Sequence, residues 1–341
     1  MSASLRVAVV GATGLVGDTM IRVLAERKFP LGQLFALASS RSLGRSVDHQ
    51  GRPLPVEELS GFDFSRADIG LFSAGSQISA QYAPLAAAAG CVVIDNTSEF
   101  RYQDDVPLVV PEVNAHAIAQ YRARGIIANP NCSTIQMLVA LKPIHDAVGI
   151  ERINVATYQS VSGAGKEAVE ELAAQSAALL SGRPIDTPRA LAKQIAFNCV
   201  PHIDQFQDNG YTREEMKILW ETRKILEDDS IRVNATAVRV PVFYGHSEAV
   251  HIETRRKISA LEARALLEGA PGVTVLDERE AGGYPTAVTE AANHDTVYVG
   301  RIREDMSHDR GLDLWVVSDN VRKGAATNSI QIAEILAREY L

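Results

Sequence analysis

Short runs of consecutive apolar residues, separated by segments with helical periodicity, dominate the first 130 residues of the chain. The runs cover Leu5–Val10, Leu34–Ala38, Ile69–Phe72, Val92–Asp95 and Ile126–Ala128. Continuous apolar runs of this length are typical of parallel strands that are buried on both faces. Helical patterns lie between them, such as the amphipathic one that follows Gly17 and runs through Leu24, and 79–89. The sequence therefore predicts a doubly wound α/β sheet of the Rossmann type.

The pattern changes near residue 153 to longer strand candidates with hairpin-like connections, interrupted by a long helix that ends near Leu180. Later strand candidates cover 233–240, 249–254, 296–303 and 312–317. This half predicts an α+β domain with a mixed sheet and helices on one face. A final helix, 324–340, places Ile332, Ile335 and Leu336 on one side, so we expect it to cover the first sheet.

Composition narrows the class of protein. The 341 residues carry a net charge of −8, which offers no electrostatic attraction for nucleic acid or an anionic membrane. The apolar stretch around 83–94 is too short to span a bilayer. Cys91, Cys132 and Cys199 have unrelated spacings that suggest neither disulfides nor a metal cluster. The start of the chain leaves no room for a signal peptide, so we expect a cytoplasmic protein.

A glycine-rich turn follows the first apolar run at once and leads into a helical pattern. Residues 11–17 have the spacing GxxGxxG, and the candidate cofactor-binding residues among them are Gly11, Thr13, Gly14, Leu15, Val16 and Gly17. In this context glycines let the backbone approach a pyrophosphate held at the helix N-terminus. Because the spacing departs from GxGxxG, a plain strand-to-helix turn is the alternative.

The end of the second predicted strand carries Ser39, Arg41 and Ser42 but no acidic residue. A carboxylate there would accept hydrogen bonds from the ribose 2′-hydroxyl of NAD. Hydroxyls and a guanidinium group instead suit a 2′-phosphate, so the sequence favours NADP, with a solvated turn as the alternative. Ser73 opens a loop of small residues after the third strand, which would let a cofactor lie close.

Cys132 lies in the string Asn129–Thr134, just before the largely apolar stretch 135–139. This pattern indicates a loop that enters a buried helix, where free amides and the helix dipole favour a thiolate. Lowering a thiol pKa by about two units requires about 2.7 kcal/mol of preferential stabilisation. A buried structural cysteine is the alternative, and for Cys91 and Cys199 an inert core thiol is the expectation.

Six groups of residues in this chain resemble aspartate-semialdehyde dehydrogenases, and together they span essentially its whole length. They are Gly11–Gly14, Pro107–Asn114, Asn129–Thr134, Phe197–Asp204, Arg239–Val242 with Gly245–Ser247, and Asp319–Ala326. The resemblance implies NADP-dependent, reversible reductive dephosphorylation of L-4-aspartyl phosphate to L-aspartate 4-semialdehyde, the shared step towards lysine, methionine and threonine. It also implies a homodimer. We expect a dinucleotide-binding domain at 1–130, completed by 321–341, and a catalytic and dimerisation domain at 131–320.

The resemblance assigns the reacting groups residue by residue. Cys132 matches the nucleophile that forms a thioester and then a thiohemiacetal. His246 matches the general acid/base, a task that suits an imidazole whose pKa lies near the operating pH. Asn131 matches a position beside the phosphate, where its amide would donate to an oxyanion. Gln159 matches the glutamine that orients the substrate.

The resemblance also implies a partner for each charged group of the substrate. Arg239 matches the arginine that binds the α-carboxylate, and Glu214 matches the partner of the ammonium group. Arg101 and Lys217 match the phosphate-binding pair. Ser162, Gly163 and Asn320 match positions that line the nicotinamide and its ribose.

One departure concerns Glu99, which stands near Arg101 where many members of the family carry serines. It would either neutralise Arg101 or face solvent. The alternative enzyme is N-acetyl-glutamyl-phosphate reductase, which acts on an acylated amine and would not need Glu214. A catalytically silent paralogue that serves as a binding protein is a third possibility, although such proteins typically lose the cysteine or histidine retained here. We expect no metal, and a small-molecule substrate.

Overall fold

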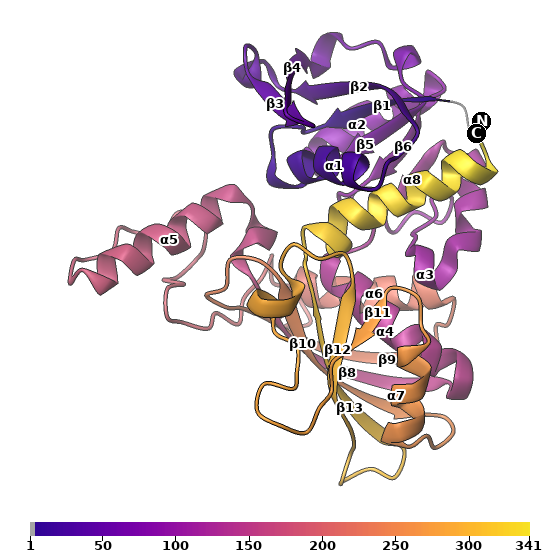
Figure 1. Ribbon diagram of the computed structural model, residues 1–341, viewed down its shortest axis with the longest axis vertical. Coiled ribbons are helices and arrows are strands. Elements are labelled where there is room, and N and C mark those ends of the chain that lie inside the picture. The colour runs from indigo at the N-terminus through magenta and orange to yellow at the C-terminus, as the bar shows by residue number, and fades with distance from the viewer. Residues whose placement is uncertain (1–3) are drawn as a thin grey trace. The chain divides into compact units, whose positions relative to one another are not determined.

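The structure is a computed structural model that describes residues 4–341, and the chain divides into two compact units (Figure 1). The first unit takes in the described residues up to Asn131 together with Ala325–Leu341. The second takes in Cys132–Gly324. Within residues 4–341, no helix combines the length and apolar composition needed to cross a bilayer.

The first unit contains a seven-stranded sheet in the order β3-β4-β2-β1-β5-β6-β7. The strands are β1 Leu5–Val10, β2 Leu31–Ala38, β3 Ser46–His49, β4 Arg52–Glu58, β5 Ile69–Phe72, β6 Val92–Asp95 and β7 Ile126–Ala128. All pairs are parallel except the β3–β4 hairpin. The predicted doubly wound sheet is confirmed. The hairpin is an addition that the sequence analysis missed, because its strands are half exposed and carry no apolar run.

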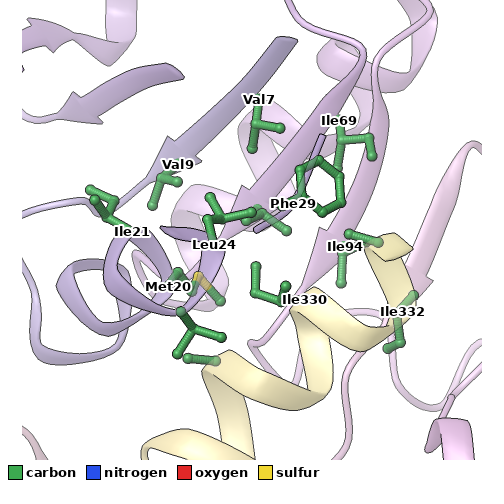
Figure 2. Close-up of a cluster of buried hydrophobic side chains, with 14 of the residues drawn as sticks. Val7, Val9, Met20, Ile21, Leu24, Phe29, Ile69, Ile94, Ile330 and Ile332 are labelled. Atoms are coloured by element: carbon green, nitrogen blue, oxygen red, sulfur yellow. The ribbon is translucent and has the colours of Figure 1, made fainter. Parts of the chain in front are cut away.

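Four α-helices belong to this unit: α1 Leu15–Glu26, α2 Ser76–Ala88, α3 Pro111–Asn114 and α8 Thr327–Glu339. Although α8 comes from the far end of the chain, its Ile330 and Ile332 lie in one hydrophobic cluster with Met20 and Leu24 of α1 and with strand residues such as Val9 (Figure 2). The prediction that the last helix covers the first sheet is therefore confirmed. Burial of Ile332 and Leu336 on one helix face explains why the pattern revealed it.

The second unit contains a six-stranded mixed sheet in the order β11-β12-β13-β10-β8-β9. The strands are β8 Ile150–Gln159, β9 Arg232–Arg239, β10 His246–Thr254, β11 Val273–Val275, β12 Val297–Glu304 and β13 Gly311–Ser318. The β8–β9 and β11–β12 pairs are parallel and the others antiparallel. The predicted mixed sheet is confirmed.

Helices α4 Cys132–Val148, α6 Arg213–Leu226 and α7 Ala260–Glu268 contact the strands of this sheet, whereas α5 Lys166–Leu180 projects away from it (Figure 1). Residues on one face of the central strands, such as Thr157 and Glu248, are buried. Their neighbours in sequence point to the opposite face because side chains alternate along a strand. This alternation decides which side chains meet at the end of the sheet.

Candidate active site

Three of the predicted site residues meet at one end of the second sheet. Gln159 ends β8 and Arg239 ends β9, and the two are direct neighbours in the parallel register. His246 begins β10, which runs antiparallel to β8 beside that same end. We predicted that this strand starts at Ala249; its earlier start is what places His246 in the sheet. All three side chains are almost fully buried.

Cys132 is the first residue of α4, and its side chain is half-buried. The next residue, Ser133, ties this helix to the sheet because its Oγ accepts a hydrogen bond of 2.9 Å from Gln159 Nε2. Gly324 lies against the cysteine: a β-carbon there would come within 2.7 Å of the Cys132 Cβ. The first turn of a helix offers amide groups that stabilise an anion, so this location suits a thiolate.

The environment of His246 sets its protonation state. Burial, helped by the positive charge of Arg239, lowers the pKa of the imidazole to about 3. Nδ1 accepts a hydrogen bond of 3.0 Å from the backbone N–H of Ser160, so the neutral ring carries its proton on Nε2. Nε2 has no hydrogen-bond partner among residues 4–341. The expectation of a pKa near the operating pH is wrong for this ring.

Near Gln159 and His246, buried charged side chains lie next to side chains of opposite charge. Glu214 accepts hydrogen bonds from Gln159 Nε2 at 3.2 Å and from Lys217 Nζ at 3.0 Å. Lys217 also donates to Asp204 at 2.7 Å, and although burial alone would lower its pKa, Glu214 and Asp204 raise it overall. The structure thus places Lys217 beside Glu214, where the two charges balance.

Arg239 is the cation of this cluster with unused donor capacity. Its Nη1 donates to the Ser160 carbonyl at 2.7 Å, but its Nε has no partner in the described part of the chain. Burial lowers the pKa of the guanidinium group, and Glu214 opposes that shift. At Gly163, a β-carbon would lie 3.0 Å from Arg239 Nη1 and 3.3 Å from His246 Nε2. A buried donor without a partner is costly unless a ligand supplies the acceptor.

Asn320 organises the loops next to His246. Its Oδ1 accepts hydrogen bonds from Ser160 Oγ at 3.0 Å, Ser162 Oγ at 3.1 Å and the Gly245 amide at 3.0 Å. Ser160 Oγ also lies 3.1 Å from His246 Nδ1. The structure therefore brings Ser162 and Asn320, predicted to line the nicotinamide, into one buried network with the imidazole.

The glycine turn of the first unit has the close approaches that a dinucleotide site needs. Gly11 has a φ of +88°, which favours glycine. A β-carbon at Gly17 would lie 2.2 Å from the Gly11 carbonyl oxygen, so only glycine fits there. Gly14 is the N-cap of α1, and Leu15 and Val16 form its first turn. These residues leave the helix N-terminus open to a phosphate group.

The residues predicted to bind the 2′-phosphate of NADP lie next to this turn. Ser39 precedes a short 3-10 turn, Ser40–Ser42, that contains the exposed Arg41. Ser42 Oγ lies 3.4 Å from Thr13 Oγ1, which joins the two segments. Ser73 donates from Oγ to the Val10 carbonyl at 3.2 Å and lies beside Gly11.

Arg101 belongs to the first unit, where it is buried and donates to the Asn96 carbonyl at 2.9 Å. The buried Asp95 shapes this loop, because it accepts hydrogen bonds from Ser79 Oγ and Thr97 Oγ1, each at 2.7 Å. The carboxylate of Glu99 makes no ion pair or hydrogen bond within residues 4–341, so it does not neutralise Arg101. Asn131, the last residue of this unit, is buried directly before Cys132.

The other two cysteines differ from Cys132. Cys91 is buried, and desolvation raises the pKa of its thiol to about 12, as befits an inert core residue. The expectation that Cys199 is also a core thiol is wrong, because it is exposed. Its apolar neighbour Phe197 is 66% exposed, so the apolar character of that segment does not reflect burial.

Sequence analysis missed three buried polar residues around the site: Thr157, Ser160 and Glu248. Alternation along β10 places Glu248 on the same face as His246, so spacing in the sequence could have indicated it. Thr157 has the same relation to Gln159, whose Nε2 lies 3.3 Å from Thr157 Oγ1.

Comparisons with known proteins identify the class that this fold and site define. Residues 6–121 match the NAD binding domain of semialdehyde dehydrogenases, and residues 141–323 match their dimerisation domain. The chain is therefore an oxidoreductase with a domain for a nicotinamide dinucleotide.

Individual relatives narrow this class. Aspartate-semialdehyde dehydrogenase of Legionella pneumophila is 64% identical across all of this chain and 98% of its own length. A crystal structure of aspartate semialdehyde dehydrogenase II from Vibrio cholerae, complexed with ASA, is 60% identical, covers both chains fully and has a TM-score of 0.97. The Candida albicans enzyme with NADP is 26% identical over 98% of both chains, with a TM-score of 0.75. The chain belongs to the aspartate-semialdehyde dehydrogenase family.

The buried imidazole leads to a prediction on protonation. NMR of the ¹⁵N-labelled ring should show His246 neutral, with its proton on Nε2, from about pH 5 to pH 8. Because the pKa of the folded state lies below the ordinary value near 6.5, His246 should cost stability progressively as the pH falls from about 6.5 towards 3. A His246→Asn variant assigns the signals. A protonation midpoint between pH 5 and 8 in the unliganded protein would contradict this prediction.

Proposed function

We propose that this enzyme catalyses the reversible, NADP-dependent reductive dephosphorylation of L-4-aspartyl phosphate to L-aspartate 4-semialdehyde through a thioester on Cys132. The observation that carries the proposal is the pair of unpartnered buried donors, Arg239 Nε and His246 Nε2, in the unit that begins with Cys132. Both side chains come close to Gly163, where a β-carbon would lie 3.0 Å from Arg239 Nη1 and 3.3 Å from His246 Nε2. The relative from Vibrio cholerae, solved with ASA, supports this choice of substrate. The pathway would be that of lysine, methionine and threonine.

In the proposed reaction, the Cys132 thiolate attacks the acyl carbon, the bond to the phosphate oxygen breaks, and phosphate leaves with that electron pair. A nicotinamide cofactor held at the glycine turn Gly11–Gly17 would supply the hydride that reduces the thioester carbon. The resulting thiohemiacetal, as its alkoxide, re-forms the C=O bond while the C–S bond breaks, which releases the aldehyde and restores the thiolate. Because His246 is neutral with its proton on Nε2, it would donate a hydrogen bond to the carbonyl oxygen as negative charge develops there. Asn131 would contribute a second donor.

The substrate's charges would find partners of opposite sign. The free Nε of Arg239, together with its Nη groups, suits a carboxylate that accepts two parallel hydrogen bonds. Glu214 would accept from the ammonium group, and Gln159, already bonded to Glu214, would hold the substrate beside Cys132. Arg101 and Lys217 would bind the phosphate. A Glu214 partner favours a free amine over the acylated amine of N-acetyl-glutamyl phosphate.

NADP fits the first unit better than NAD by the chemistry of the residues beside the glycine turn. Arg41 and the hydroxyls of Thr13 and Ser42 are donors for a 2′-phosphate. Ser39 adds a further hydroxyl. The Candida albicans relative with NADP supports the choice.

Replacing the nucleophile tests the covalent mechanism. Cys132→Ser should reduce turnover by at least a thousandfold, because an alcohol is ionised far less than a thiol at neutral pH, while NADP binding survives. Turnover is followed through NADPH absorbance with aspartate semialdehyde and phosphate as substrates. Cys199→Ser, which changes an exposed thiol, is the matched control and should keep full activity. Equal turnover of Cys132→Ser and wild type would refute the thioester.

Arg41 tests the choice of cofactor. Arg41→Ala should weaken NADP binding by about tenfold or more and leave NAD binding nearly unchanged, because only NADP carries the 2′-phosphate. Dissociation constants for both cofactors measured by fluorescence titration check this. Arg45→Ala, at another exposed arginine a few residues on, provides the control. If Arg41→Ala weakened both cofactors alike, the 2′-phosphate assignment would be wrong.

We further infer a homodimer joined through the outer face of the second sheet. Helices α4, α6 and α7 contact the opposite face. This face has the short helical turn Ala287–Ala291 packed near Val317 but otherwise carries half-exposed side chains, among them Tyr158 and Trp315, whose ring centroids lie 5.6 Å apart. In its centre Ala249 of β10 is flanked by Ala156 of β8 and Trp315 of β13. The match of residues 141–323 to a dimerisation domain supports this location.

A charged side chain at the centre of this face should dissociate the dimer. Ala249→Arg would bury an unpaired guanidinium group between the two sheets, so analytical ultracentrifugation should detect mostly monomer. The control is Leu261→Arg on α7: because Leu261 is 77% exposed, this substitution should leave the dimer intact. A stable Ala249→Arg dimer would place the interface elsewhere.

A further inference from the structure

Glu248 is a buried carboxyl group for which the proposed mechanism has no use. It has no exposed surface and lies on β10, two residues after His246 and therefore on the same face of the strand. Its register neighbours are Thr157 on β8 and Val316 on β13. A charged carboxylate in such a place is strongly disfavoured unless it is paired.

The polar groups next to Glu248 belong to the first turns of α4. The side chains of Ser133 and Gln136 lie near enough to favour its charged form, but they do not offset desolvation, which raises the pKa of Glu248 well above its ordinary value. In the described part of the chain, neither carboxyl oxygen makes a hydrogen bond of normal geometry, and Gln136 Oε1 also has no partner. Both carboxyl oxygens of Glu248 and the amide oxygen of Gln136 are thus buried acceptors that lack a hydrogen-bond donor.

One proton would resolve this mismatch. A protonated carboxyl group becomes a donor while keeping an acceptor oxygen, so it can donate to Gln136 Oε1 and still accept from a neighbour. Gln136 Nε2 already lies 3.4 Å from the carbonyl oxygen of His246, and Ser133 Oγ accepts from Gln159 Nε2. Glu248 therefore lies between two residues of α4, each of which contacts a residue of the candidate site.

We propose that Glu248 is a positioning residue for the reaction: a neutral carboxylic acid beneath the first turn of α4 that fixes Ser133 and Gln136, and through them Gln159 and the backbone of His246. The inference rests on the proposed roles of Cys132 and Gln159. Neutrality matters because a second buried anion near the start of α4 would oppose ionisation of Cys132. A carboxylic acid supplies the donor without the charge.

Two substitutions separate the donor from the charge. Glu248→Gln keeps the shape and a donor without any charge, so its kcat should stay within about threefold of wild type. Glu248→Leu removes the donor, and the loosened Gln159 should lower kcat by about tenfold to a hundredfold. Binding of NADP should be the same in both. If Glu248 only filled space, Leu would preserve kcat as well as Gln does. Activity retained in Glu248→Gln and lost in Glu248→Leu therefore indicates a role for the hydrogen-bond donor.

The thiol of Cys132 provides the second readout. The rate of iodoacetamide labelling of the Cys132 peptide, measured against pH by mass spectrometry, reports its pKa without any turnover. Glu248→Gln should leave this pKa unchanged, because the residue is neutral in both proteins. A fall of about one unit or more would show that Glu248 is ionised in the wild type and would overturn the proposal. This measurement decides the matter even if Glu248→Leu fails to fold.

The control is Thr254→Val, which removes a partly buried hydrogen bond from the far end of the same strand, where the buried Thr254 donates from Oγ1 to the Arg310 carbonyl. It should lower the melting temperature and leave kcat unchanged. Equal losses of kcat in Glu248→Gln and Glu248→Leu, or none in Glu248→Leu, would refute positioning by a neutral acid. Failure of the proposed function would give a different result, because Cys132→Ser would then turn over normally. In that case the labelling rates of the Glu248 variants would still report whether Glu248 is neutral.

Discussion

The hydrogen bond from Gln159 to Ser133 is the contact on which the candidate site depends. It ties the end of a central strand to the first turn of the helix that begins at Cys132. Arg239 is held at the same end by register, and His246 by the start of β10. Strand ends fixed by a ladder of backbone hydrogen bonds position side chains more firmly than loops do, which suits a reaction that requires aligned groups.

Burial is the constraint that these residues share, and it selects their charge states. Desolvation penalises ions, so Glu214 is held by Lys217 and Gln159, Lys217 is held by two carboxylates, and His246 is neutral. Arg239 is the exception, with a donor left free. An arginine cannot lose its proton readily, so a site that buries one without full compensation favours an anionic ligand.

Sequence patterns predicted the parts of the fold that burial shapes most strongly. β5, β6 and β7 have the predicted bounds because both faces of each strand are covered, and the apolar run ends where the strand does. The half-exposed β3 and β4 were missed for the opposite reason. Helix α6 was also missed, although Thr212 and Glu215 form a capping box whose Thr-x-x-Glu pattern is visible in the sequence. The low pKa of His246 was beyond sequence reasoning, because it follows from burial by distant segments.

The charges of the second unit's cluster show why one more anion would matter. Arg239 and Lys217 are opposed by Glu214 and Asp204, and His246 contributes no charge, so these groups sum to zero. A Cys132 thiolate would then be the single unbalanced charge among these groups, stabilised by the helix N-terminus and by Arg239. If Glu248 were also ionised, two buried anions would compete for that stabilisation, and the thiolate would lose part of it. Keeping the supporting carboxyl group neutral leaves the helix dipole and Arg239 available to the nucleophile.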